Sequence, residues 1–120
     1  MKKVYPLSFM LCALSVSPLT LSAEPSNSPE LDTTVATKIE HIVVYSKQGN
    51  GDLLVSVKAP SERCAGGYFV EKSSPGYDGI FSLLLAAHQV QSPIILSANP
   101  EALWPSSQQS VCELHSVILP

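Results

Sequence analysis

The sequence predicts a mostly β domain with one helix, in the order three strands, a helix and two strands. The first observation is a run of apolar residues at helical spacing over residues 74–90. The second is a set of short segments on both sides of that run. These segments are rich in β-branched residues and are separated by turns that contain glycine or proline.

The helix is predicted over residues 74–90. Ser74 suits the N-cap position, and Pro75 suits the first helical position because its missing N–H would have no partner there. Asp78 lies in the first turn, near the positive end of the helix dipole. Apolar residues recur at helical spacing from Tyr77, and others widen the apolar arc beyond the stripe of a surface helix. We therefore expect a helix that the strands cover on nearly every side.

The first 23 residues have the pattern of a signal peptide. Lys2 and Lys3 precede a mostly apolar run, and Ala23 stands before the expected cleavage point. Residues 24–37 contain two prolines and many small polar residues, which predicts a flexible lead-in. Residues 38–120 are predicted to form one folded domain. A periplasmic or secreted protein is therefore expected, with no membrane insertion after cleavage.

A hairpin is predicted at the start of this domain. Residues 38–45 are rich in β-branched residues, and their alternation slips between Ile39 and Ile42, as it does at a β-bulge. A glycine-rich turn at residues 49–51 suits positive φ angles and leads into residues 53–58, where every second residue is apolar. The two segments are expected to pair as antiparallel strands.

Three further strands complete the prediction. Residues 68–72 form the third strand, residues 93–97 the fourth and residues 111–119 the last, with a loop over residues 98–110. Strict alternation in the last strand places Ile118 on the same face as Cys112.

The order β-β-β-α-β-β is that of an OB-fold, a five-stranded, partly open barrel with a helix at one end. The alternative is an α+β sandwich with the helix on one face of the sheet. The wide apolar arc of the helix favours the OB-fold-like barrel, in which the helix would plug the end.

Cys64 and Cys112 are the two cysteines that remain after the leader. In an oxidising compartment, an even pair favours a disulfide over two free thiols or a metal site. The bridge would join the turn before the third strand to the start of the last strand. On the chain-entropy model, it would stabilise the fold by about 4 kcal/mol.

The charge pattern argues against a nucleic-acid partner. The formal charge of −3 includes the two leader lysines, so the remaining chain carries −5. Its cations are scattered along the sequence, whereas a phosphate backbone requires a clustered basic face.

No catalytic residue, metal site or cofactor is expected. His41, His88 and His115 are far apart and show no zinc-ligand spacing. The chain has no G-x-S-x-G nucleophile motif. The acidic residues that could form a glycosidase pair are interpreted instead as solvated surface charge. These residues are Asp52, Glu71, Asp78 and Glu113.

Three aromatic residues are the candidate ligand contacts. Trp104 lies between Pro100 and Pro105, and a ring on such a stiffened loop can serve as a platform for a sugar or a partner surface. The alternative is that Trp104 covers the open end of the barrel. Tyr45 and Tyr68 lie on predicted strands and have the same two interpretations, packing or ligand contact.

These features together resemble those of small secreted bacterial OB-fold proteins related to the binding (B) subunit of subtilase-type cytotoxins. The likeness covers residues 38–119. It rests on the leader, the hairpin turn at residues 49–52, Cys64 with the following Gly-Gly-Tyr, the apolar helix and the closing strand from Cys112.

The resemblance implies a non-enzymatic binding module. In the toxins, a ring of five subunits binds sialylated host glycans and carries a separate catalytic subunit. The resemblance also implies the Cys64–Cys112 pairing, whereas no glycan-binding residue is carried over. Our first hypothesis is a glycan-binding, toxin-B-like module that forms a homopentamer. The alternative is a stand-alone periplasmic protein that interacts with, or inhibits, another protein.

Overall fold

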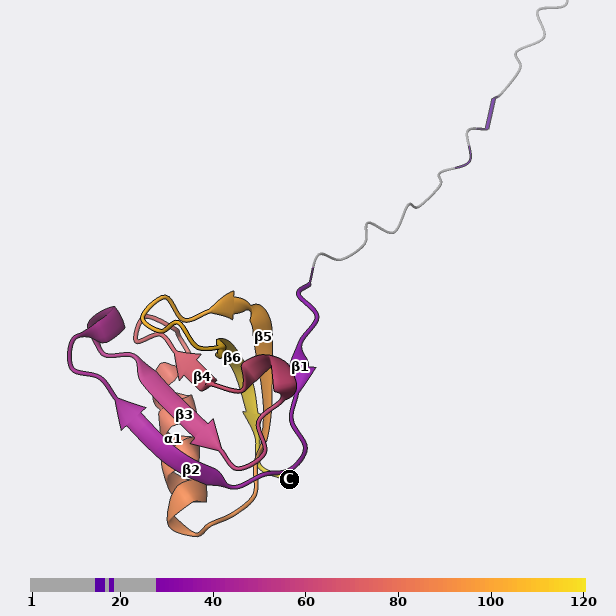
Figure 1. Cartoon of the computed structure of the whole chain (residues 1–120). Coiled ribbons are helices and arrows are strands. Elements are labelled where there is room, and N and C mark those ends of the chain that lie inside the picture. The colour runs from indigo at the N-terminus through magenta and orange to yellow at the C-terminus, as the bar shows by residue number, and fades with distance from the viewer. Residues whose placement is uncertain (1–14, 17, 19–27) are drawn as a thin grey trace, which may run out of the picture.

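The described part of the chain forms a six-stranded mixed sheet with one α-helix between strands (Figure 1). This computed structural model describes residues 15–16, 18 and 28–120. The predicted signal peptide and the start of the predicted lead-in lie almost entirely outside the described residues. The elements in chain order are β1 (Asp32–Thr33), β2 (Ile39–Val44), η1 (Gln48–Asn50), β3 (Leu53–Val57), η2 (Glu62–Cys64), β4 (Gly67–Val70), α1 (Tyr77–Gln89), β5 (Ile95–Leu103) and β6 (Val111–Ile118).

The strands lie in the order β1-β5-β6-β4-β3-β2. All neighbouring strands are antiparallel except β4 and β6, which are parallel. The prediction of a mostly β domain with one helix is confirmed. The predicted five-stranded barrel is wrong, because the sheet has a sixth strand and is not closed into a barrel.

The chain enters the sheet earlier than predicted. Residues 32–37, expected to belong to a flexible lead-in, contain β1 and a further bridge between Thr37 and Ile94. The hydroxyl of Thr34 accepts a 3.0 Å hydrogen bond from Leu96 N–H, and the hydroxyl of Thr37 accepts one of 2.9 Å from Ala59 N–H. Because these buried hydroxyls satisfy backbone donors, small polar residues belong to the sheet here.

The hairpin of β2 and β3 is confirmed. Gly49, Asn50 and Gly51 all have positive φ angles, as the glycine-rich turn requires. The register shifts between Ile39 and His41, so the predicted bulge is also present.

Helix α1 begins later than predicted, because residues 74–76 form a separate turn. Tyr77 N–H donates to Ser74 O at 3.0 Å and closes this turn. Gly76 is the N-cap, so the positions predicted for Ser74 (N-cap) and Pro75 (first helical residue) are wrong. Asp78 does lie in the first turn. No helix in the described ranges is long and apolar enough to cross a membrane.

Helix α1 is buried along one face only. Tyr77, Leu84 and Ala87 are buried, whereas Leu85 is 38% exposed. Val90, just after the helix, is 75% exposed. The prediction of a helix covered on nearly every side is therefore wrong, and α1 packs against β2 and β6 as an amphipathic helix.

Strand β5 is longer than predicted and takes up half of the expected loop. Its last residue, Leu103, pairs with Cys112, and Trp104 N–H donates to Val111 O at 2.9 Å. Trp104 is therefore held beside β6.

Strand β6 contains a bulge that reverses its predicted alternation. Ala98 pairs with Leu114 but Ser97 pairs with Ser116, so His115 is the extra residue. Val117 consequently packs against the core, while Ile118 is 47% exposed. The shared face predicted for Ile118 and Cys112 is wrong.

Both faces of the sheet carry apolar side chains. The inner face packs against α1 and holds the larger cluster, which includes Leu53, Val55, Tyr68, Leu84 and Leu96. The outer face holds a smaller cluster of Phe69, Trp104 and Val111, with Tyr45 and Leu54 packed against it. Because successive strand residues point to opposite faces, Leu53 and Leu54 belong to different clusters.

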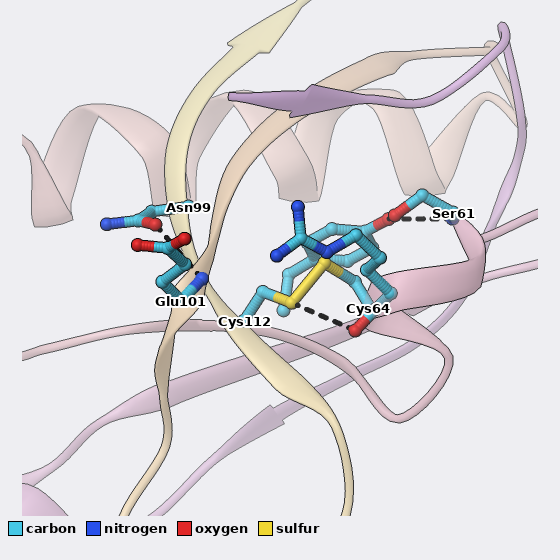
Figure 2. Close-up of a disulfide and its surroundings, with 7 residues drawn as sticks. Ser61, Cys64, Asn99, Glu101 and Cys112 are labelled. Atoms are coloured by element: carbon cyan, nitrogen blue, oxygen red, sulfur yellow. Dashed lines mark hydrogen bonds between the residues drawn. A yellow bond between two sulfur atoms is a disulfide. The ribbon is translucent and has the colours of Figure 1, made fainter. Parts of the chain in front are cut away.

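The predicted disulfide is present (Figure 2). Cys64 and Cys112 have a Cα–Cα distance of 5.4 Å and are both fully buried. The bridge joins η2 to β6 across 48 residues of sequence. Figure 2 also shows Asn99 and Glu101 of β5 beside this connection.

We predict that the double substitution Cys64→Ala/Cys112→Ala lowers the free energy of unfolding by about 4 kcal/mol, because the unfolded chain regains the freedom of a long closed loop. Denaturant unfolding of the oxidised protein and the double variant measures this difference. A loss of unfolding free energy below about 1 kcal/mol would mean that the disulfide does not stabilise the fold by constraining the unfolded chain.

Candidate functional site

The candidate site is built around the buried carboxylate of Asp52 at the start of β3. Asp52 is 3% exposed. Its Oδ1 accepts a hydrogen bond from Lys72 N–H at 3.0 Å, and its Oδ2 accepts one from Trp104 Nε1–H at 3.1 Å. One side chain thus joins the hairpin turn, the end of β4 and the segment after β5. The interpretation of Asp52 as solvated surface charge is wrong, whereas Glu71, Asp78 and Glu113 are exposed as expected.

The hairpin turn provides the space for this carboxylate. Gly49 has a φ of 59°, and a Cβ atom at this position would collide with the Asp52 side chain. Asp52 N–H donates to Gln48 O at 3.0 Å, which closes the turn. The glycine therefore has two roles here, a left-handed backbone and room for the buried acid.

Tyr77 connects the same turn to helix α1. Its hydroxyl donates to Gly51 O at 2.9 Å, and Lys72 Nζ lies 4.4 Å from the centroid of its ring. Burial raises the pKa of the Tyr77 phenol above its ordinary value, and the negative charges of Asp52 and Asp78 raise this pKa further. The neutral phenol is therefore the form that fits the folded protein.

The indole of Trp104 supports two other rings on the outer face. The Phe69 ring lies 6.2 Å from it in a stacked arrangement, and the Tyr45 ring lies 5.2 Å from it with a tilt of 43°. Such offset and tilted contacts between aromatic rings are favourable. Because Asp52 holds the indole N–H, it also determines where Tyr45 rests.

The three predicted ligand contacts have different surroundings. Trp104 is 4% exposed and Tyr68 is fully buried, with its hydroxyl 3.1 Å from Ser61 N–H as an acceptor. Tyr45 is half-buried. Trp104 and Tyr45 lie together on the outer face, whereas Tyr68 belongs to the inner cluster. A ligand role for these residues stays a prediction, and Tyr45 is the most exposed of the three.

Polar groups lie along β2 and β3 on the face that carries Tyr45. His41 pairs with Ser56, and its Nδ1 is 3.3 Å from the Ser56 hydroxyl. Val43 pairs with Leu54 between this polar pair and Tyr45. The outer surface of β2 therefore combines an aromatic ring, an aliphatic side chain and an imidazole.

A separate hollow of about 290 Å³ opens next to η2. It is lined by Ala65, Gly66, Gln109 and Ser110, and Gly66 N–H donates a hydrogen bond to Ser110 O. Its lining residues include one hydroxyl, that of Ser110, and no acidic or basic side chain that could activate it.

The described residues contain no group of three or more His, Cys, Asp or Glu side chains that could hold a metal ion. The Asp52 carboxylate is buried, and both of its oxygens have protein donors. The carboxylate therefore joins the segments that carry its two donors.

Sequence reasoning missed the role of Asp52. Its partners, Lys72 and Trp104, are 20 and 52 residues away. The one local signal is the acid directly after a glycine-rich turn, and that pattern is equally typical of an exposed hairpin end.

Comparison of the chain with known proteins gives no match to a family model, a curated protein or a solved structure. The likeness to toxin B subunits therefore rests on the sequence features alone.

We predict that Trp104→Phe lowers the free energy of unfolding by about 1–3 kcal/mol, because it leaves a buried oxygen of Asp52 without its donor. Urea unfolding measures the loss. In a double-mutant cycle with Asp52→Ala, the two losses should be non-additive by at least about 0.5 kcal/mol. Strictly additive losses would mean that the two side chains do not interact.

We predict that stability falls at alkaline pH through Tyr77. Because its pKa is higher in the folded than in the unfolded protein, the folded state retains the proton longer. Its contribution is fully present below the unfolded pKa of about 10 and is lost as pH rises through the folded value. Unfolding curves across this range should show the decline in the native protein and a smaller one in Tyr77→Phe. Equal declines would contradict this assignment.

Proposed function

We propose that the protein is a non-enzymatic, secreted or periplasmic binding module whose ligand contacts Tyr45 on the outer face of the sheet. The observation that carries this proposal is the support of Tyr45 by the buried Trp104, whose indole is held by Asp52. A ring held in place before binding loses little conformational freedom when a ligand arrives.

A glycan is the ligand class that this surface suits best. Sugars present apolar faces that stack on aromatic rings and hydroxyls that require hydrogen-bond partners. Tyr45 offers the ring, and the neighbouring His41 and Ser56 offer polar groups on the same face. The resemblance to toxin B subunits supports the same ligand class.

The proposed fold family is an open variant of the OB-fold. The five longer strands follow the order β2-β3-β4-β6-β5 with a parallel contact between β4 and β6, and the helix lies between β4 and β5. The bend at residues 34–38 leads directly from one edge strand of the sheet to the other. These features support the proposal, together with the resemblance.

The second candidate is a stand-alone protein that binds another protein by strand addition. The specific observation in its favour is that β2 lies at an edge of the sheet, beside β3 alone in the described part of the chain. Addition of a partner strand to such an edge is a common mode of peptide recognition.

We predict that the oxidised, folded protein binds members of a glycan array that includes sialylated glycans, and that Tyr45→Ala weakens this binding about tenfold through loss of the stacking ring. The matched control is Val90→Ala, because Val90 is exposed beyond the end of α1 and does not belong to the outer-face cluster.

Two results would contradict the glycan proposal. One is an array with no signal when circular dichroism confirms that the protein is folded. The other is an equal loss of binding in the Tyr45→Ala and Val90→Ala variants. Recovery of one stoichiometric protein partner by the same folded sample would then favour the second candidate.

A further inference from the structure

Strand β2 forms one edge of the sheet and pairs with β3 alone among the residues described here. Figure 1 shows β2 along the margin of the sheet, next to β3 and in front of α1. An edge strand presents unpaired N–H and C=O groups and is therefore a template for another strand. The opposite edge strand, β1, has only two residues and offers a much shorter template.

The second half of β2 lacks the features that usually protect an edge. The bulge at Glu40 and its exposed carboxylate disturb pairing at the beginning of the strand. The segment from His41 to Tyr45 then contains no Lys, Arg, Asp, Glu, Pro or Gly. Val44 is 52% exposed, so the apolar part of the edge is accessible to solvent.

The backbone at this edge points outward at two positions. Tyr45 N–H donates to Asp52 O, so Tyr45 and, two residues earlier, Val43 direct their backbone groups towards β3. Hydrogen-bonded and non-hydrogen-bonded pairs alternate in an antiparallel ladder. Ile42 and Val44 therefore direct their N–H and C=O groups towards the free edge.

We propose that this edge pairs with β2 of a second copy of the chain, in antiparallel orientation, about a two-fold axis at Val43. In this register, Ile42 of each copy exchanges backbone hydrogen bonds with Val44 of the other. Val43 faces its own equivalent as a non-hydrogen-bonded pair, and His41 faces Tyr45. Each copy uses the same surface, so the contact closes as a two-fold dimer.

The side chains fit this register. His41, Val43 and Tyr45 share the outer face, while Ile42 and Val44 share the inner face, so each side chain meets one on its own face. Ile42 of one copy covers the exposed Val44 of the other. No pair places like formal charges opposite each other, which an edge-to-edge contact must avoid.

A second copy fits better than an unrelated strand because the segment is symmetric in character about Val43. From Val43, either direction along the chain gives an aliphatic residue and then a residue with a ring, which are Ile42 and His41 on one side and Val44 and Tyr45 on the other. The contact is short and belongs to the size class of weak interfaces, so association should depend on concentration.

The dimer also completes the proposed binding surface, and this part of the inference rests on the proposed function. Across the two-fold axis, His41 of the second copy lies opposite Tyr45 of the first. Each Tyr45 ring thereby gains an imidazole from the other copy. The two Tyr45 rings then lie on the same face of one continuous sheet, where they would bind a multivalent ligand with increased avidity.

The first test is the mass of the oxidised protein by light scattering after size exclusion, over a dilution series. The native protein should change from dimer to monomer on dilution. Val43→Lys and Val43→Asp should each raise the dissociation constant about tenfold or more, because they place like charges at the two-fold axis. An equal mixture of the two variants should recover the dimer by pairing opposite charges, which also shows that both are folded.

The second test is Val43→Cys, because directly opposite residues of a non-hydrogen-bonded pair have Cα atoms about 4.5 Å apart, within the range for a disulfide. Under oxidation this variant should form a covalent dimer. The matched control is Val35→Cys, because Val35 is 70% exposed and lies in the bend between β1 and β2. This control should remain largely monomeric on a denaturing gel.

A native protein that stays monomeric at every concentration, with no excess cross-linking of Val43→Cys over Val35→Cys, would overturn the proposal. A ring of five subunits that Val43→Lys leaves unchanged would also overturn it. Glycan binding by a native protein that stays monomeric at every concentration would overturn the dimer and leave the proposed function standing. A native dimer that cross-links through Val43→Cys but binds no glycan would do the reverse.

Discussion

The buried carboxylate of Asp52 is the contact on which the outer face of the sheet depends. It holds the Lys72 amide with one oxygen and the Trp104 indole with the other, and it occupies the space left by Gly49. An acid buried without donors would cost several kcal/mol, so these contacts must form together. The hairpin, the end of β4 and the segment after β5 are therefore fixed relative to one another. The Tyr45 ring packs against the Trp104 indole that these contacts hold in place.

Local signals predicted much of the fold. The β-branched runs, the glycine turn before Asp52 and the helical spacing from Tyr77 each act within a few residues, and the elements that they predict are present. The disulfide was predicted from the two cysteines that follow the predicted leader and from the oxidising compartment expected for an exported chain. The predictions that are wrong depend on contacts between residues that are distant in sequence. Thr34 joins the sheet only because Leu96 donates to its hydroxyl, and the alternation in β6 is reversed by a bulge that pairing with β5 introduces.

The candidate site could be predicted only in part. Trp104 and Tyr45 were identified as candidates by their residue type, and the structure brings them together. Which of the two residues is buried was not predictable, because the burial of Trp104 depends on Asp52, which is 52 residues away. Trp104 is buried beneath the outer face, and Tyr45 is the more exposed of the two residues. A buried polar contact thus positions the aromatic rings of the outer face, and the proposed pairing of β2 would extend that face to a second copy.

The most direct measurement is hydrogen exchange at the indole N–H of Trp104, the one tryptophan in the chain, so that its signal in a ¹H–¹⁵N spectrum is unambiguous. We expect slow exchange with solvent in the native protein, because the group is buried and bonded to Asp52, and fast exchange after Asp52→Ala. An indole that exchanges in the native protein as fast as an exposed tryptophan would mean that Asp52 does not hold the outer face together.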